Sequence, residues 1–257
     1  MNVNLEKGRS FLSKVKINGR ILLCGVTGSH FYGFPAPDSD LDLKGIHVAP
    51  TREMLGLFPS NSTINLERTE DGMLYDYTSN EIGQALWLLL KGNGNMIERL
   101  FSSLQLYESQ ELTSLREFAP KYLSRKAAHH YRGFFKQICE QHTKEGLCRV
   151  KSLLYTYRAA LTGVHLLITG AVVGDVCKLG PIYGFPEVME LVQIYQGSSE
   201  KKTLKPEDDS LYRKAWPILL EKLEEAEKNS ILPEEPADPA ACSEWLVSLR
   251  LKEIRPE

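Results

Sequence analysis

The sequence lacks the cysteine patterns of disulfide-rich and zinc-binding proteins. It has five cysteines, an odd number, and no two of them form a C-x-x-C pair. Their wide spacing favours reduced, mostly buried thiols and a cytoplasmic location. A structural zinc site is not expected.

Long apolar runs are also missing. The most apolar uncharged run, residues 159–174, is shorter than the roughly 20 residues that a membrane span needs. His165 lies within this run. The first residues lack the apolar segment of a secretory signal peptide. We therefore expect a buried helix at 159–174 and no membrane partner.

The sequence also has no large excess of positive or negative charge. The net charge is -2 at pH 7, so no basic field over the whole protein indicates a nucleic-acid ligand. Contacts to nucleic acid would have to come from a local basic patch. The length of 257 residues allows one large domain or two small ones, each able to bury a core.

The first third of the chain has the pattern of strands and turns. Residues 20–26 form a short apolar run, as a buried strand does. Residues 41–48 alternate apolar and polar side chains, with a change of phase at Gly45 that predicts a bulge. Residues 62–79 predict a hairpin with Glu70-Asp71-Gly72 as its turn. The residues of the second strand expected to face the core are Leu41, Leu43, Ile46 and Val48.

From residue 78 onward the pattern becomes helical. Thr78 and Glu81 fit a capping box, and Asn95 fits the cap of the next short helix. Gly180-Pro181 is interpreted as a join between helices. Later helices are expected near 108–118, 120–141, 146–173, 185–197 and 207–229. A proline-rich acidic linker, residues 232–240, precedes a last amphipathic helix that ends near Leu251.

These patterns predict an α+β fold. We expect a small mixed β-sheet module with flanking helices, followed by a C-terminal helical bundle. The predicted domains are residues 1–110 and residues 111–257, with the acidic linker inside the second.

Two aspartates one residue apart suggest a cation site. Asp40 and Asp42 point the same way if they lie on a strand. At a separation of about 7 Å and an effective dielectric near 20, two such charges repel by about 2 kcal/mol. A cation between them would remove this repulsion, and oxygen ligands suit Mg²⁺ or Mn²⁺. The alternative is a solvated turn without a ligand.

A third carboxylate and a phosphate grip would complete a catalytic site. Asp76 lies within an apolar strand, where an unpaired charge is costly. If that strand pairs beside the strand of Asp40 and Asp42, the three carboxylates converge, and two metal ions can align an attacking oxygen with a phosphate. The backbone at Gly28 and the hydroxyl of Ser29, in the preceding turn, would hold phosphate oxygens.

This combination resembles the polymerase-β-type nucleotidyltransferase superfamily. The stretch GSHFYGFPAPDSDLDLKG is most similar to its RNA-repair-pathway nucleotidyltransferase family, and the similarity spans about residues 20–170. The sequence departs from that family at Gly94, where proline is expected in an Asn-Pro-Asn-like turn. The matching residues are Gly28, Ser29, Tyr32, Gly33, Ser39, Asp40, Asp42 and Gly45.

The resemblance implies nucleotidyl transfer: an acceptor hydroxyl attacks the α-phosphate of a nucleoside triphosphate, and pyrophosphate leaves. By the same resemblance, Asp40 and Asp42 bind both metal ions. Asp76 would bind one of them and activate the acceptor hydroxyl. The resemblance also adds Ser39 to Gly28 and Ser29 as a nucleotide-binding residue.

Two helical faces carry further candidates. Lys151, Tyr155 and Arg158 share a face of a largely apolar helix, where the cations would meet the triphosphate and Tyr155 would stack on a base. A second face would bind RNA through Arg125, His129, Arg132 and Lys136. For each face the alternative is an ordinary solvated stripe.

The leading hypothesis is a metal-dependent nucleotidyltransferase that acts on RNA, such as tRNA or a broken strand. Alternatives are transfer to a protein or a small molecule, and a non-catalytic nucleotide-binding or antitoxin-like module. The sequence leaves open which nucleoside triphosphate is used, ATP or another, how many nucleotides are added, and the oligomeric state.

Overall fold

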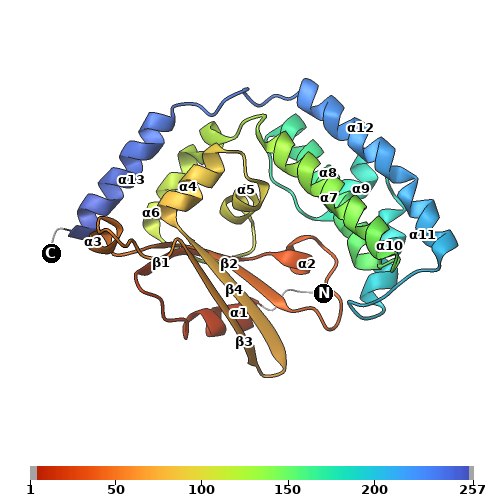
Figure 1. The fold of residues 1–257 in the computed structure, drawn as a ribbon, viewed down its shortest axis with the longest axis horizontal. Coiled ribbons are helices and arrows are strands. Elements are labelled where there is room, and N and C mark those ends of the chain that lie inside the picture. Colours follow the sequence, from red (N-terminus) through yellow and green to blue (C-terminus); the bar gives the residue numbers. More distant parts are fainter. Residues whose placement is uncertain (1–4, 255–257) are drawn as a thin grey trace. The chain divides into compact units, whose positions relative to one another are not determined.

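The structure, a computed structural model, describes residues 5–254 and contains two compact units with interleaved segments (Figure 1). The sheet unit comprises residues 5–27, 40–124 and 235–254. The helical unit comprises residues 28–39 and 125–234. The chain therefore leaves the sheet after its first strand, contributes a short segment to the helical unit, and returns for its second strand.

The sheet has five strands in the order β3-β4-β2-β1-β5. β2 runs parallel to β4, whereas the other neighbouring pairs are antiparallel. This is the mixed sheet that the sequence predicted. The strands are β1 (Arg20–Val26), β2 (Leu41–Val48), β3 (Thr63–Glu70), β4 (Met73–Glu81) and β5 (Gln105–Glu108).

Helices cover both faces of the sheet within this unit. α1 (Leu5–Leu12) lies on the side opposite α4 (Ile82–Leu90) and α5 (Gly94–Phe101) (Figure 1). The ring of Phe11 in α1 stacks on Tyr75 of β4 at a centroid distance of 4.4 Å. The remaining helices of the unit are α3 (Thr51–Met54), α6 (Gln110–Phe118), the 3-10 helix η1 (Ala119–Tyr122) and α13 (Pro239–Ile254).

The helical unit is built around α8 (Val150–Thr169), most of whose residues are buried. α7 (Ala127–Glu145) packs closely on it, because a side chain at Gly163 would meet Tyr131 at 2.7 Å. The other helices are α2 (Gly28–Phe31), α9 (Val176–Tyr183), α10 (Val188–Gln196), α11 (Pro206–Arg213) and α12 (Ala215–Lys228). Within residues 5–254, no helix combines the length and the apolar character that a membrane crossing requires. The predicted α+β class, with a mixed sheet and C-terminal helices, is confirmed.

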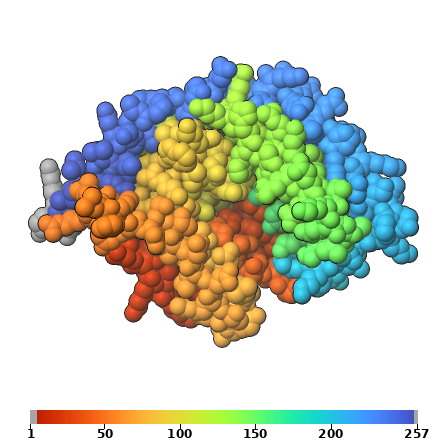
Figure 2. Space-filling model, viewed as in Figure 1, coloured from red at the N-terminus to blue at the C-terminus, as the bar shows by residue number. Residues whose placement is uncertain are grey.

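The hairpin between β3 and β4 forms where the sequence predicted it. Asp71 and Gly72 at its tip have φ values of 50° and 74°, and positive φ at both central residues is what a two-residue type I′ turn requires. Both residues are exposed. Figure 2 shows the hairpin, in light orange, at the surface of the sheet unit.

Several local expectations were wrong. Gly180-Pro181, expected as a join between helices, lies inside α9. β2 pairs with β4 without interruption from Leu41 to His47, so Gly45 carries no bulge. The irregularity lies in β1, between Ile21 and Leu23. The change of phase has another cause: Ile46 and Val48 are buried on one face of the sheet, while Leu41 and Leu43 are buried on the other.

The predicted caps were also misplaced. β4 continues through Thr78 to Glu81, and the Glu81 side chain itself caps α4 by accepting a hydrogen bond from the Gly83 amide. α5 is capped by Asn93, whose side chain accepts from the Met96 amide at 3.0 Å, and not by Asn95.

The division into units differs from the expected domain boundary near residue 110. The sheet unit extends to Ser124 and also includes α13. α13 is held there by an ion pair between Arg250 and the buried carboxylate of Glu81, at 2.7 Å. The last helix thus belongs with the sheet, and the acidic linker leads out of the helical unit.

The segment between β1 and β2 contributes aromatic side chains to the core of the helical unit. Phe34 is fully buried and makes edge contacts with Tyr155 and Tyr195. Phe31 fills the space beside Gly174, where a side chain would meet its ring at 2.3 Å. These contacts explain the aromatic residues that follow the Gly-Ser turn.

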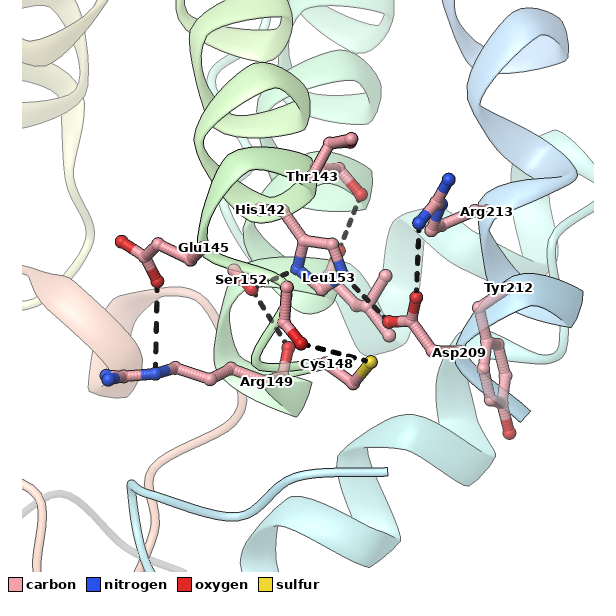
Figure 3. A network of polar contacts seen from close by, with 12 residues as sticks. His142, Thr143, Glu145, Cys148, Arg149, Ser152, Leu153, Asp209, Tyr212 and Arg213 are labelled. Atoms are coloured by element: carbon pink, nitrogen blue, oxygen red, sulfur yellow. Dashed lines mark hydrogen bonds and ion pairs between the residues drawn. The ribbon is translucent and has the colours of Figure 1, made fainter. Parts of the chain in front are cut away.

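A buried polar network joins three helices of the same unit (Figure 3). Nε2 of His142 in α7 lies 2.7 Å from Oδ1 of Asp209 in α11, and both side chains are almost fully buried. Nδ1 of His142 hydrogen-bonds to the Ser152 hydroxyl, which in turn donates to the Arg149 carbonyl. The network fixes α11 to α7 and to the start of α8.

Replacing Asp209 by alanine should lower the free energy of unfolding by about 1–3 kcal/mol, because a buried His142 nitrogen loses its partner. Asp208→Ala is the matched control, since Asp208 is an exposed neighbour, and should change stability by about 0.5 kcal/mol or less. Urea unfolding followed by circular dichroism measures both. Equal urea midpoints for the two variants would contradict the structural role of the network.

Candidate active site

The parallel pairing of β2 and β4 places two of the predicted carboxylates side by side. Asp42 of β2 is the register partner of Asp76 of β4. Register partners in neighbouring strands point to the same face of a sheet and lie close together. The sequence predicted that the carboxylates converge if their two strands are neighbours. The structure meets this condition for Asp42 and Asp76.

Asp40 directly precedes β2 and lies outside the strand. In chain order it follows Ser39, which belongs to the helical unit. Among residues 5–254, no three histidine, cysteine or acidic side chains form a cluster that would hold a metal ion. The structure thus brings Asp42 and Asp76 together, and the role of Asp40 as a third ligand stays a prediction.

Lys44 provides a cation beside this carboxylate pair. Its Nζ lies 2.7 Å from Oδ2 of Asp76 and 3.7 Å from Oδ1 of Asp42. The same ammonium donates to the Thr78 hydroxyl at 3.3 Å. The sequence prediction overlooked this partner, although Lys44 is two residues after Asp42 and so shares its face of the strand.

The two carboxylates fit a divalent cation by their chemistry. Aspartate oxygens are the ligands that Mg²⁺ and Mn²⁺ prefer, and Asp42 and Asp76 are partly exposed, so an ion can reach them. Asp42 and Asp76 are therefore the residues that would hold the ion.

A buried arginine supports the strands that carry the site. Nη1 of Arg99 in α5 donates to the Gly45 carbonyl of β2 at 2.8 Å and also to the Asn80 side chain of β4. Burial lowers the pKa of the Arg99 guanidinium to about 10, and burial raises the pKa of the nearby Cys24 thiol to about 12. Arg99 therefore ties β2 to β4 from within the core, and Cys24 is an inert core residue.

The predicted phosphate-grip residues form a hydrogen-bonded chain inside the helical unit. The Ser29 hydroxyl lies 3.2 Å from the Ser39 hydroxyl, which donates to Oε1 of Glu200 at 2.9 Å. Oε2 of Glu200 accepts from the Lys151 ammonium at 2.8 Å. Three predicted nucleotide-binding residues thus meet around one carboxylate that the sequence did not single out.

The remaining members of the Lys151 stripe have different surroundings. Arg158 is only 1% exposed, and its guanidinium stacks 3.8 Å above the Tyr32 ring while it hydrogen-bonds to the Tyr32 hydroxyl. Tyr155 is half-buried and lies edge-on to Tyr32 and Phe34. In this structure Arg158 and Tyr155 are therefore packed beneath the Gly28–Ser39 segment.

Comparison with known families assigns the chain to a family. The family model described as the RNA repair pathway DNA polymerase beta family matches residues 9–247 of the chain. The chain belongs to that family. The match covers both units and includes Asp42, Asp76 and the Gly28–Ser39 segment.

Similar proteins are found in archaea and bacteria. An uncharacterized protein of Methanocaldococcus jannaschii, MJ0002, is 32% identical over 222 residues, which cover 84% of this chain and 88% of that protein. The uncharacterized protein YcgL of Bacillus subtilis is 27% identical over 146 residues, or 55% of this chain and 54% of YcgL.

One solved structure covers nearly the whole chain at low similarity. The crystal structure of a nucleotidyltransferase-like protein from Exiguobacterium sibiricum matches 98% of this chain and 81% of its own, with 11% identity and a TM-score of 0.34. The assignment to the RNA repair pathway family rests on the family match and indicates a polymerase-β-type nucleotidyltransferase.

The predicted RNA-binding face of this family member is only partly free. Arg125 donates to the carbonyls of Leu232 and Ser230, and Arg132 forms an ion pair with Glu227. His129 and Lys136 are exposed. Arg125 lies in the turn before α7, so the observed helix, unlike the one expected over 120–141, does not include it, and only His129, Arg132 and Lys136 are on α7. Arg125 and Arg132 both bind other segments of the helical unit.

Replacing Lys44 by methionine should expose the repulsion between Asp42 and Asp76. Loss of this ion pair is expected to lower the melting temperature by about 2–4 °C in EDTA. Added Mn²⁺ should raise the melting temperature of Lys44→Met more than that of the unmodified protein, because the ion then replaces the missing ammonium.

Lys14→Met is the matched control for this test. Lys14 forms a 2.7 Å ion pair with Glu70 in the same unit, without a second carboxylate in the pair. Its melting temperature should show no additional response to Mn²⁺. A Lys44→Met protein that melts like the unmodified one in EDTA and gains nothing from Mn²⁺ would contradict the role given to Lys44.

Proposed function

We propose that the protein transfers a nucleotide from a nucleoside triphosphate to an acceptor hydroxyl on RNA, with release of pyrophosphate. The observation that carries this proposal is the register of β2 and β4, which pairs Asp42 with Asp76. The family match over residues 9–247 supports both the reaction class and a role in RNA repair or end modification.

The side chains have distinct roles in this proposal. Asp40 and Asp42 would hold both divalent cations, and Asp76 would hold one of them and accept the proton of the acceptor hydroxyl. The hydroxyl oxygen then bonds to the α-phosphorus, and the bond from that phosphorus to the pyrophosphate oxygen breaks. Gly28, Ser29, Ser39 and Lys151 hold the phosphates, while Arg158 and Tyr155 fix the Gly28–Ser39 segment through Tyr32 and Phe34.

Mg²⁺ or Mn²⁺, when bound, would neutralise the charge that develops on the α-phosphate and the leaving pyrophosphate. For Asp42 and Asp76 to hold an ion, Lys44 would have to release them, because its ammonium bonds to Asp76 and lies near Asp42. We propose that Lys44 then remains nearby as a donor to Thr78, its second partner.

Asp42→Asn and Asp76→Asn should each reduce transfer at least about a hundredfold, because each loses a negative ligand or the proton acceptor. The assay incubates purified protein with each labelled nucleoside triphosphate, Mg²⁺ or Mn²⁺, and tRNA or nicked RNA. Asp71→Asn, at the exposed hairpin tip, removes the same charge from the same unit and should keep full activity.

Activity that survives in either Asp42→Asn or Asp76→Asn would show that the paired carboxylates are not the catalytic centre. Melting curves of all three variants establish that the loss is not due to unfolding. Nucleotide binding without metal dependence and without turnover in the unmodified protein would favour the non-catalytic nucleotide-binding module.

The acceptor has a second candidate class. Arg125 and Arg132 are engaged within the helical unit, which leaves His129 and Lys136 as the exposed members of the predicted RNA-binding face. This observation favours testing a protein or a small molecule as acceptor in the same assay. Label that remains on protein after nuclease treatment would identify a protein acceptor.

A further inference from the structure

Glu200 lies where the predicted phosphate-grip residues of the helical unit meet. It belongs to the loop of residues 197–205, between α10 and α11. Its carboxylate accepts from the Ser39 hydroxyl at 2.9 Å and from the Lys151 ammonium at 2.8 Å. A donor pair of this kind, one hydroxyl and one ammonium, is equally suited to two oxygens of a phosphate.

The hydrogen bonds that lead through Ser39 to Glu200 all point in one direction. Ser39 Oγ receives hydrogen bonds from the Ala36 amide and from the Ser29 hydroxyl, so its own proton points to Glu200. Each donor along the chain strengthens the next, and the final acceptor is an anion. The donor groups around the Glu200 carboxylate are therefore already oriented toward an anion.

Backbone hydrogen bonds fix the loop just after Glu200. The Val150 amide donates to the Lys202 carbonyl at 3.0 Å, and the Leu204 amide donates to the Cys148 carbonyl at 2.9 Å. The Glu200 amide donates to Asp38 at 3.0 Å. After the loop, α11 is held by the buried pair of His142 and Asp209 (Figure 3). These bonds give the Glu200 carboxylate a fixed position.

We infer that the Glu200 carboxylate is an internal anion that a phosphate group of the nucleotide displaces from Ser39 and Lys151. The inference rests on the proposed function, because it takes these residues as the phosphate grip. Glu200 and a phosphate compete directly, since the Ser39 hydroxyl has one proton to donate. Nucleotide binding is then an exchange of one anion for another, and Glu200 lowers the affinity for the triphosphate.

The exchange is feasible because the ion pair is accessible. The side chains of Lys151 and Glu200 are 33% and 25% exposed, so water screens their attraction. Pairs of this kind contribute little stability, and their removal changes a competing equilibrium by about two- to fivefold. A ligand with several negative charges can therefore displace Glu200 without unfolding the loop.

The test measures binding by calorimetry, with ATP and, separately, with inorganic tripolyphosphate in EDTA as the probe. Glu200→Gln keeps the size and the acceptor for Ser39 but removes the charge, and should bind both probes about two- to fivefold more tightly than the unmodified protein. Lys151→Gln should weaken binding, and the gain from Glu200→Gln should disappear when the two changes are combined.

Glu140→Gln is the charge-matched control. Glu140 is exposed on α7 of the same unit, so its replacement reports the effect of removing one negative charge at a distance. Its affinity for tripolyphosphate should equal that of the unmodified protein. Hydrogen exchange provides a second measurement: the Glu200 amide should exchange faster when tripolyphosphate is bound, because the contact to Asp38 loosens.

The outcomes separate this inference from the proposed function. Binding that is unchanged or weakened in Glu200→Gln, with slower exchange of the loop on binding, would show that Glu200 supports the site and would overturn the inference alone. Absence of ATP and tripolyphosphate binding to all variants, together with absence of transfer, would contradict both. Tighter binding in Glu200→Gln by a protein that transfers nothing would support the anion exchange and contradict catalysis.

Discussion

The pairing of β2 with β4 brings two negative charges to neighbouring positions on one sheet face, and this constraint governs the sheet unit. The fold tolerates the pair because Lys44, on the same strand and the same face as Asp42, lies beside both carboxylates. Arg99 binds the backbone of β2 and the Asn80 side chain of β4 from the core. Lys44 thus offsets the charge of the carboxylate pair, and Arg99 links the two strands from the core.

The helical unit shows the corresponding arrangement with the opposite charge. Its donors, Ser39 and Lys151, surround the carboxylate of Glu200. In each unit, a side chain of the protein has the charge that the proposed substrate complex would supply there: an ammonium beside the metal ligands, and a carboxylate among the phosphate donors. In this proposal, substrate binding would exchange internal partners for external ones, so that no charged group is left unpaired.

Periodicity and motif spacing predicted the parts of the site that depend on local sequence. The bounds of β1 and β2 and the hairpin follow from alternation and from the Asp-Gly turn. The pairing of β2 with β4 was only a condition of the sequence prediction, and the structure supplied it. The same alternation places Lys44 on the face of Asp42, so Lys44 could have been predicted to lie there. A pattern of apolar and polar positions does not, however, say which polar side chains pair.

Other features depend on contacts between distant segments. Glu200 is 161 residues from Ser39, and no local pattern connects them. The partners of Arg125 and Arg132 are also about a hundred residues away in sequence, so a helical wheel showed a basic stripe where the fold has internal bonds.

Two elements were hard to predict for local reasons. β5 has only four residues, and α9 contains Pro181, so they lacked the length or the composition by which strands and helices are predicted. The sequence did not fix the first residue of α5, so it could not decide whether Asn93 or Asn95 caps that helix.

The central claim is that Asp42 and Asp76 form the cation site of a nucleotidyltransferase. Anomalous diffraction from crystals grown with Mn²⁺ and a non-hydrolysable nucleoside triphosphate tests it most directly. The account predicts an anomalous peak about 2–2.5 Å from carboxylate oxygens of both aspartates, with Lys44 moved away from Asp76. Manganese bound elsewhere, with the Lys44–Asp76 ion pair intact beside a bound nucleotide, would contradict it.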